Sequence, residues 1–600
     1  MQTTLLGLAI ALILALIAAL IGPYFIDWNQ FRPQFEAEAT KVVGAPVKVS
    51  GELQARLLPT PTLRLGSVTV GGPNDLGKVR ADKLDVEFSL GDLMRGQWRA
   101  NQLTISGMSL DLGLDRDGRI DWPASNGKFD WASLSIDRLN LTGRIALHDA
   151  RSRSTLELND IAFSGDVRSL AGAIRGDGSV TVAGARYPFR VSSGQTNDGN
   201  GTRLHLNIDP GERPVSAELD GVVNFETRAP RFEGTLTLAV PLAPKAKASE
   251  ARTPWKVATR LKADHNAAQL EQIEVSYGGE DRALKFSGAG DMRFGASPLL
   301  HVVLAARQLD ADRLFGKDTA ADGSAEPVPI WPALRALMTE MPHPPLPVRI
   351  EASSEQIMLG GRPLQNLSAE LHGDAASWAI DRLDLRAPGS TQVTFNGAPS
   401  SRDVAGALDI DSSDPDVLMA WLQGRSDLSG RSQKPLRLHG NVAVSPDGAA
   451  LDGLKAEIDG GTIEGRLALS APSTGGPRLD AALRADHLDL DATARSVRSI
   501  AGPNADWPEQ ATVSLDVGRA ISAGQELRPF SIKFSYSPKM IALDRLKIGQ
   551  AGGVTLDGSG HFDRDGLLGS LALDSTAPSV GQITGIVAPF APSIAARLNA

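Results

Sequence analysis

Pairs of aspartates are the residues of this sequence whose type and spacing most suggest chemistry. They stand two positions apart where predicted strands end, at Asp310 and Asp312, Asp409 and Asp411, and Asp489 and Asp491. Two carboxylates at this spacing can bind calcium, or serve as acid and base in a cleft. Alternatively, they cap the helices that follow or face water. Because the pairs recur at equivalent positions, and one active site does not need a copy in each module, we favour the capping interpretation.

Other catalytic signatures are missing from the sequence. The nine histidines are scattered without an H-E-x-x-H or His-x-His pair, and no G-x-S-x-G elbow or P-loop occurs. Glycine pairs such as Gly278-Gly279 and Gly552-Gly553 fall between predicted strands, where hairpin turns explain them better than phosphate binding does. Cysteine is absent, which excludes disulfides and thiol catalysis. We therefore expect no enzyme activity, no catalytic residue, no cofactor and no metal.

Composition limits the partners. The net charge of -9 argues against nucleic acid, whose phosphates require clusters of Lys and Arg. The 600 residues exceed one ordinary core, so several domains or a repeat array are expected. The 61 glycines and 37 prolines, with only 5% aromatic residues, suit many strands joined by tight turns.

Alternation of apolar and polar residues predicts strands through most of the chain, each with one apolar and one polar face. Near the N-terminus the apolar face consists of Val47, Val49, Leu63, Leu65, Leu84, Val86, Phe88, Leu110 and Leu112. If that face lines a groove, these nine residues are its predicted lining.

A repeat is visible in the second half of the sequence. Residues Val348 to Leu385 match Val513 to Ile548 at offsets of 163 to 165, and the match continues from Gly406–Val417 to Gly569–Val580. Each copy contains an apolar-Asp-Arg-Leu motif, at Ile380 to Leu383 and at Leu543 to Leu546. One module is thus several meandering strands and then a short helix. Stacked modules predict a mainly β, elongated, repeat-built antiparallel sheet that could curl into an apolar groove, with a few short helices.

The first residues form a long apolar run. Without a charge before Asp27, the stretch from Leu5 to Ile26 reaches roughly 33 Å as a helix, enough to cross a bilayer. We expect one uncleaved transmembrane anchor, because a signal peptide would have a basic start and a cleavage site after its apolar core; a cleaved signal is the alternative. The anchor residues are Leu5, Leu6, Leu8, Ile10, Leu12, Ile13, Leu14, Leu16, Ile17, Leu20 and Ile21.

The predicted organisation has seven parts. A transmembrane anchor (1–26) leads into a helix and first strands (27–123). A further β-rich region follows (124–250), and then a β-module with a linker (251–345). The last three parts are β-modules at 346–430 (first repeat copy), 431–510 and 511–600 (second repeat copy).

The first 123 residues contain a series of motifs in a characteristic order. An apolar helix and an amphipathic helix precede Gly44-Ala45-Pro46-Val47-Lys48-Val49 and Leu58-Pro59-Thr60-Pro61. A strand from Ala81 and the turn Asp117-Gly118-Arg119-Ile120-Asp121-Trp122 follow. This order resembles the AsmA family of Gram-negative envelope proteins. The family usually has Asn before that Trp, where this chain has Asp121. Beyond these residues the likeness is architectural.

The resemblance implies what covers the apolar face. A second sheet, a partner protein or lipid acyl chains would each do so, and periodicity does not separate them. Since the family is associated with a β-sheet groove and with lipid movement, we expect a single-pass inner-membrane protein with its bulk in the periplasm. Its expected role is phospholipid transport between the membranes and outer-membrane biogenesis. The alternative is a non-catalytic assembly factor with an envelope protein as partner; an envelope hydrolase would need one module with distinctive acids or histidines.

Overall fold

The structure is a computed structural model. It describes residues 26–588 apart from 73–77, 96–98, 116–119, 122–134, 151–152, 170–172, 197–200, 225–228, 241–252, 280, 316–342, 398–403, 423–434, 446–447, 459–460, 471–475, 494–507, 523, 552 and 564–568. The predicted anchor residues, Leu5 to Ile21, lie outside the described part. Among the helices that are described, none has the length and hydropathy needed to span a bilayer.

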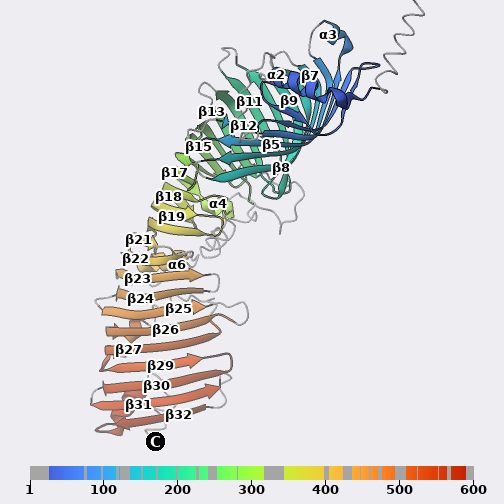
Figure 1. Cartoon of the computed structure of the whole chain (residues 1–600). Helices are drawn as coiled ribbons and strands as arrows, with labels where there is room; N and C mark the ends of the chain where they lie inside the picture. The colour runs from blue at the N-terminus through green and yellow to red at the C-terminus, as the bar shows by residue number, and fades with distance from the viewer. Residues whose placement is uncertain are drawn as a thin grey trace, which may run out of the picture. The chain divides into compact units, whose positions relative to one another are not determined.

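The chain divides into two compact units, Met1–Val302 and Val303–Ala600, with the boundary inside strand β17 (Leu299–Asp310). Both are built almost entirely of strands, so the mainly β prediction is confirmed (Figure 1). The seven-part division predicted from the sequence is finer than these two units, and its boundaries stay predictions.

The first unit begins with a short 3-10 helix η2 (Trp28–Phe31), helix α2 (Arg32–Val43) and, later, α3 (Leu90–Met94). Pro33 in the first turn and Gly44 in the left-handed conformation at the end delimit α2. The strands are β1 (Val47–Val49), β2 (Leu53–Arg56), β3 (Thr62–Val70), β4 (Lys78–Phe88), β5 (Arg99–Leu114), β6 (Ile120–Asp121), β7 (Ser135–Asp149), β8 (Ser154–Ser169), β9 (Ala173–Val182), β10 (Ala185–Gln195), β11 (Thr202–Ile208), β12 (Ser216–Asn224), β13 (Arg231–Val240), β14 (Trp255–Ala263), β15 (Ala267–Tyr277) and β16 (Leu284–Arg293).

The second unit carries three named helices, α4 (Ala311–Phe315), α6 (Pro415–Leu422) and α8 (Val580–Val587). Its strands follow one another as rungs of a single layer (Figure 1). They are β18 (Val348–Leu359), β19 (Arg362–Gly373), β20 (Trp378–Ala387), β21 (Thr391–Gly397), β22 (Val404–Ser412), β23 (Leu436–Ser445), β24 (Gly448–Ile458), β25 (Gly461–Ser470), β26 (Arg478–Asp489), β27 (Gln510–Ser522), β28 (Gln525–Leu527), β29 (Phe530–Tyr536), β30 (Met540–Ala551), β31 (Val554–Asp563) and β32 (Gly569–Thr576).

Most neighbouring strands are antiparallel, as predicted, but each unit also contains a parallel pair that the prediction did not include. Strand β5 pairs in parallel with β7, and β26 pairs in parallel with β27. In each case a long stretch of sequence, residues 115–134 or 490–509, separates the two strands. A parallel pair requires such a crossover, whereas a tight hairpin produces an antiparallel pair.

The two repeat copies fold alike. Strands β18 to β22 and helix α6 in the first copy correspond to β27 to β32 and helix α8 in the second, with β28 and β29 together in the place of β19. The pairing register shifts at Glu370/Leu371 in the first copy and at Lys533/Phe534 in the second, which are the same positions at an offset of 163. The repeat seen in the sequence is therefore a repeat in the sheet.

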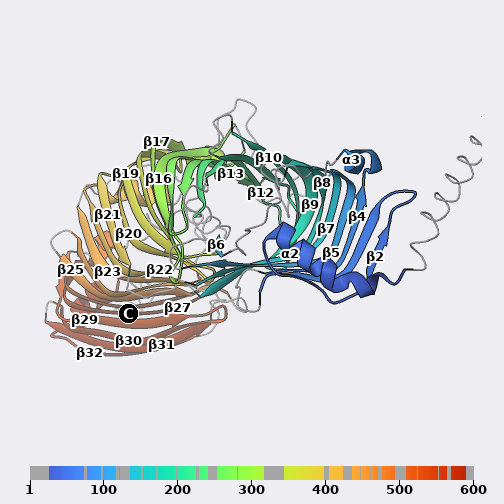
Figure 2. The same ribbon diagram turned by 45° about the horizontal axis from the view of Figure 1, so that its top comes forward.

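The apolar-Asp-Arg-Leu motif is a β-bulge. In β30 the register shifts between Leu543 and Leu546, and comparable shifts occur at Leu451/Leu454 in β24 and Leu270/Ile273 in β15. A spacing of three within a period of two would place the second side chain on the wrong face. The bulge absorbs one residue, so both apolar side chains stay on one face, and it bends the strand. The strands of each unit are visibly bowed (Figure 2).

Candidate functional site: a half-covered apolar sheet face

The apolar face of the second unit is covered at one end of its strands and open at the other. In β30 and β31 the cross-strand pair Ile548 and Leu556 is 3% and 5% exposed. The pair Ile541 and Phe562, farther along the same two strands, is 42% and 37% exposed. All four side chains lie on one face, because of the bulge in β30 and the even spacing in β31. The sheet therefore buries its apolar face only locally.

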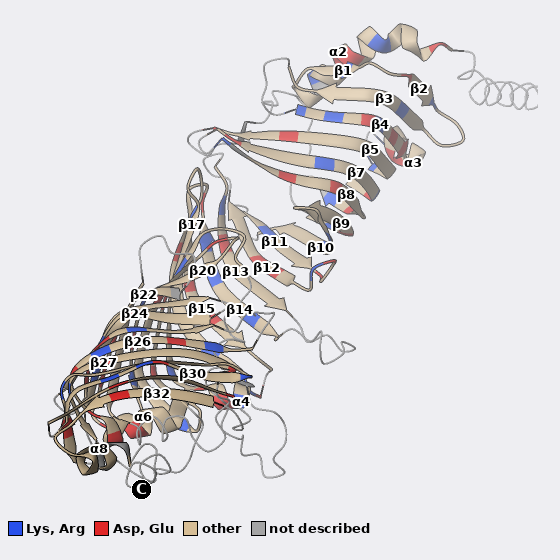
Figure 3. Cartoon of the chain, turned by 90° about the horizontal axis from the view of Figure 1, so that it is seen from below, with Lys and Arg blue, Asp and Glu red and all other residues tan. Residues whose placement is uncertain are grey.

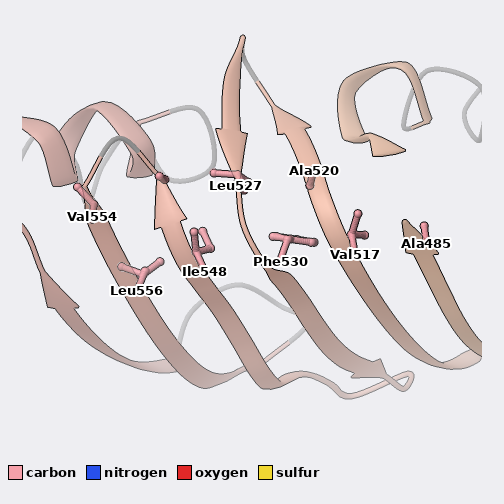
Figure 4. Packing of buried hydrophobic residues seen from close by; sticks show 9 residues of the cluster. Ala485, Val517, Ala520, Leu527, Phe530, Ile548, Val554 and Leu556 are labelled. Atoms are coloured by element: carbon pink, nitrogen blue, oxygen red, sulfur yellow. The ribbon is translucent and has the colours of Figure 1, made fainter. Parts of the chain in front are cut away.

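Short helices cover the buried end. The cluster around Val517, Leu527 and Phe530 packs against Ile583 of α8 and against Leu490, which follows β26. In Figure 4 the labelled side chains of this cluster point to one side of the strands. Among the described residues, such helices follow β17, β22, β26 and β32 and lie at the ends of these strands.

The corresponding end of the first copy is held by polar contacts as well as apolar ones. Trp421 of α6 packs with Leu359, and its Nε1–H donates to the Leu359 carbonyl at 2.7 Å. The buried Asp312 carboxylate of α4 accepts from the backbone N–H groups of Gly360 and Gly361, at 2.7 and 2.8 Å. The Trp421 Nε1–H and the Asp312 carboxylate thus each have a hydrogen-bond partner, which avoids the cost of leaving a buried polar group unsatisfied.

A second open area lies on β25. Leu467 and Leu469 are 39% and 47% exposed, and they stand on the face of the partly covered Ile463. Their cross-strand neighbours include Leu451 in β24 and Leu479 in β26, which are only half-buried. Large apolar side chains that stay exposed next to one another are typical of a surface that binds something apolar.

The opposite face of the sheet is polar. Exposed cross-strand ion pairs run along it, for example Arg203–Asp220, Arg437–Asp411 and Arg466–Asp452. Figure 3 shows that positions of both charges recur along the strands. Such exposed pairs contribute little stability, typically about 0–1 kcal/mol each. These ion pairs instead distinguish the two faces of the sheet, because the charged face is compatible with water and the apolar face is not.

The paired aspartates have structural partners. Asp310 caps α4 by accepting from the Arg313 N–H, and Asp489 accepts from the Ala492 N–H. Asp409 and Asp411 lie against His439 and Arg437 on the polar face. Within the described residues, no group of three or more potential metal ligands occurs. Asp310, Asp409, Asp411 and Asp489 agree with the capping and water-facing interpretation, whereas the buried Asp312 instead binds the backbone of Gly360 and Gly361.

Asp384, on the polar face of β20, carries a perturbed carboxyl group. A hydrogen bond from the Arg382 guanidinium, 2.7 Å long, lowers the pKa of Asp384. A hydrogen bond from the Thr394 hydroxyl also lowers this pKa, whereas burial raises it. The side chain of Arg382 is more than half exposed, so this pair lies at the surface rather than in a catalytic cleft.

The lining residues predicted near the N-terminus do not share one environment. Val47, Val49 and Leu65 are buried, because Phe35 and Ala39 of α2 pack over them. Leu63 and Leu84 are half-buried at the margin of the same cluster. Helix α2 therefore covers this part of the apolar face, as the later short helices do in the second unit.

The other predicted lining residues lie farther from α2. Val86 and Phe88 pack beside a separate cluster that includes Ile136 and Val167. Leu110 and Leu112 are half-buried and pair with Ile145 and Leu147 across the parallel β5–β7 boundary. Sequence reasoning did not single out the more exposed Ile541, Phe562, Leu467 and Leu469. The sequence signal that could have identified these four residues is apolar alternation that continues to the strand ends farthest from the helices.

Comparison with known proteins agrees with the N-terminal motifs. Residues 2–186 match the model of the AsmA family. Neither the curated proteins nor the solved structures contain a match to the chain. The family match supports an AsmA-like protein of the bacterial envelope and confirms the resemblance read from the motifs. Over residues 2–186 the chain is therefore similar to the AsmA family.

Proposed function

We propose that the protein carries or shields phospholipid in the envelope, with the acyl chains lying against the open part of its apolar sheet face. The observation that supports this most directly is the contrast within β30 and β31. Ile548 and Leu556 are buried beneath helices, whereas Ile541 and Phe562 continue the same face into solvent.

The energetic argument is that an open apolar sheet face favours an apolar cover. Removing apolar surface from water stabilises by about 25 cal/mol per Å², or about 0.8 kcal/mol per methylene of an acyl chain. An acyl chain lying along a strand would meet Ile541, Leu543 and Leu546 in succession. The polar headgroup would remain at the open strand ends, in contact with water.

The proposed mechanism is passive. Asp310 and Asp489 cap helices and Asp411 lies in an ion pair, and transport by apolar lining would require neither catalysis nor a cofactor. In this proposal the apolar run from Leu5 to Ile21 is a retained inner-membrane anchor and the sheet lies in the periplasm. The anchor would hold one end of the apolar face near a membrane, and delivery of lipid would support outer-membrane biogenesis.

Site-specific photocrosslinking tests the proposal. A photoreactive amino acid is placed in cells at Ile541 or Phe562 on the apolar face. The matched controls are Ala542 and His561, which neighbour them on the same strands and point to the opposite face. Phospholipid adducts from the first pair and not from the second are expected.

Two outcomes would overturn the proposal. Adducts to one stoichiometric protein from Ile541 and Phe562, without lipid, would favour the assembly-factor alternative. Lipid adducts of equal yield from both faces would show nonspecific membrane contact rather than a lipid-binding face.

A further inference from the structure

A polar hollow lies on the second unit, away from the apolar face. It has a volume of about 450 Å³ and is lined by Arg307, Gln308, Glu355, Gln356, Gln365 and Asn366. Five of these side chains are exposed, and only Gln356 is half-buried. The hollow is therefore open to solvent and entirely polar in its named lining, in contrast to the face proposed to bind lipid.

Irregular pairing of the strands builds the hollow. Between the pairs Ser354–Leu367 and Gln356–Gln365, residues Glu355 and Asn366 drop out of the β18–β19 ladder. Asn366 has a φ of 51°, in the left-handed region that Asn tolerates better than most residues. On the other side of β19, the register against β20 shifts between Gln365 and Ser368, which is a bulge. A bulge re-aims side chains, so β19 presents two consecutive polar residues where regular alternation would present one.

Strand β17 supplies the third pair. Arg307 and Gln308 are consecutive and both exposed, between the apolar Leu304 and the buried Leu309. Three neighbouring segments thus each contribute two adjacent polar residues to one place on the sheet. This arrangement concentrates four amides, a guanidinium and a carboxylate in the hollow.

The two charged side chains of the hollow are not neutralised by ion pairs with other described residues. Neither Arg307 nor Glu355 forms an ion pair with another described residue, whereas the bulge residue Asp452 pairs with Arg466. In the second repeat copy, Pro529 stands where the first has Asn366, and Glu526 pairs with both Arg519 and Arg528. The hollow is thus not a requirement of the repeat architecture, because the second copy fills the equivalent region with its own ion pairs.

We infer that this hollow is a binding site for a saccharide. Carboxamides both donate and accept hydrogen bonds, which matches the hydroxyl and acetamido groups of sugars. The nearby Glu355 disfavours polyanions and Arg307 disfavours cations, so a ligand of low net charge fits best. An apolar ligand would find no apolar residue among the lining. The inference is independent of the proposed lipid function, since it concerns different residues on the other face.

Saturation-transfer NMR on the purified full chain tests this site, with chitotriose and maltotriose as probes and without glycosidic detergent. We expect at least one trisaccharide to bind. Arg307→Ala and Glu355→Gln should each weaken its affinity about tenfold or more, since a hydrogen bond to a charged group is worth about that much. The matched control Arg349→Ala, an exposed arginine on β18 outside the hollow, should leave binding unchanged.

The contrary results are specific. Absence of binding by either trisaccharide would overturn the inference, and so would binding that Arg307→Ala and Glu355→Gln leave unchanged. If free alanine bound in the hollow and neither sugar did, a zwitterion would be the ligand and the saccharide assignment would be wrong. Because the substituted side chains are exposed, thermal melting of each variant should match that of the parent, which separates lost binding from lost folding.

Discussion

Two facing glycines on β21 and β22 set how closely these strands approach on the apolar face. Gly397 and Gly406 are cross-strand partners. A Cβ added at Gly406 would lie 2.0 Å from the Asn396 carbonyl oxygen, and one at Gly397 would lie 2.1 Å from the Ile380 carbonyl oxygen. Both contacts are with backbone atoms, so relief requires the strands to separate or flatten rather than a side chain to rotate.

We therefore predict that Gly406→Ala destabilises the second unit. Replacing Gly by Ala where it fits without strain stabilises by about 0.4–1 kcal/mol, through the unfolded chain. Overpacking costs about 1–3 kcal/mol, and contact with the backbone places this site at the upper end. The expected net loss in the free energy of unfolding is about 2 kcal/mol. The matched control is Gly581→Ala in α8, where an added Cβ meets nothing within 4 Å and helix propensity predicts a gain of up to about 1 kcal/mol.

Urea unfolding followed by hydrogen exchange of peptides from β21 and β22 measures the effect within the unit concerned. A multi-unit chain need not unfold in one step, so a local probe is preferable to a single global signal. If Gly406→Ala proved as stable as the parent or as Gly581→Ala, the close approach of these strands would not be a constraint.

Three further predictions concern the covered end of the sheet and its polar face. Trp421→Phe should cost about 1–3 kcal/mol of unfolding free energy, because the buried Leu359 carbonyl loses its donor; calorimetry showing no loss would contradict this. Asp312→Asn should cost about 1–3 kcal/mol of unfolding free energy, because one of two backbone N–H groups loses its carboxylate acceptor. Asp310→Asn should cost almost nothing, since Asn caps helices as well as Asp does. Equal denaturation midpoints of the two variants would refute the distinction. The hydrogen bonds to Asp384 lower its pKa in the folded state, so its stabilising contribution is complete above about pH 4 and is lost as the pH falls through that lowered pKa. Asp384→Asn should therefore reduce the loss of stability on acidification, measured as urea midpoints from about pH 6 to about pH 3. An unchanged dependence of the midpoint on pH would contradict this prediction.

The sequence predicted the strands and the repeat well because each strand obeys a simple period. It also contained the bulges in a form that is easy to overlook. Leu543 and Leu546 are three positions apart within an otherwise period-two pattern. Only an extra residue in the strand keeps both on one face, so the spacing itself indicates a bulge.

Other features depend on contacts between distant residues, which periodicity does not encode. Alternation predicts that Val49 and Phe562 both lie on an apolar face, but not that α2 buries the first and that the second stays 37% exposed. The parallel pairing of β26 with β27 likewise depends on the path of a long connection. The hollow could not be predicted, since Arg307 and Asn366 are far apart in sequence and meet only through the strand order.

Native mass spectrometry of the purified full chain tests the central claim most directly. If phospholipid lies along the open apolar face, the parent should retain phospholipid masses, and a variant with Ile541→Asp and Phe562→Asp should retain far less. The matched variant Ala542→Asp, on the opposite face, should behave as the parent does. A parent chain that carries no phospholipid, or lipid retention that is equal in all three proteins, would contradict the account.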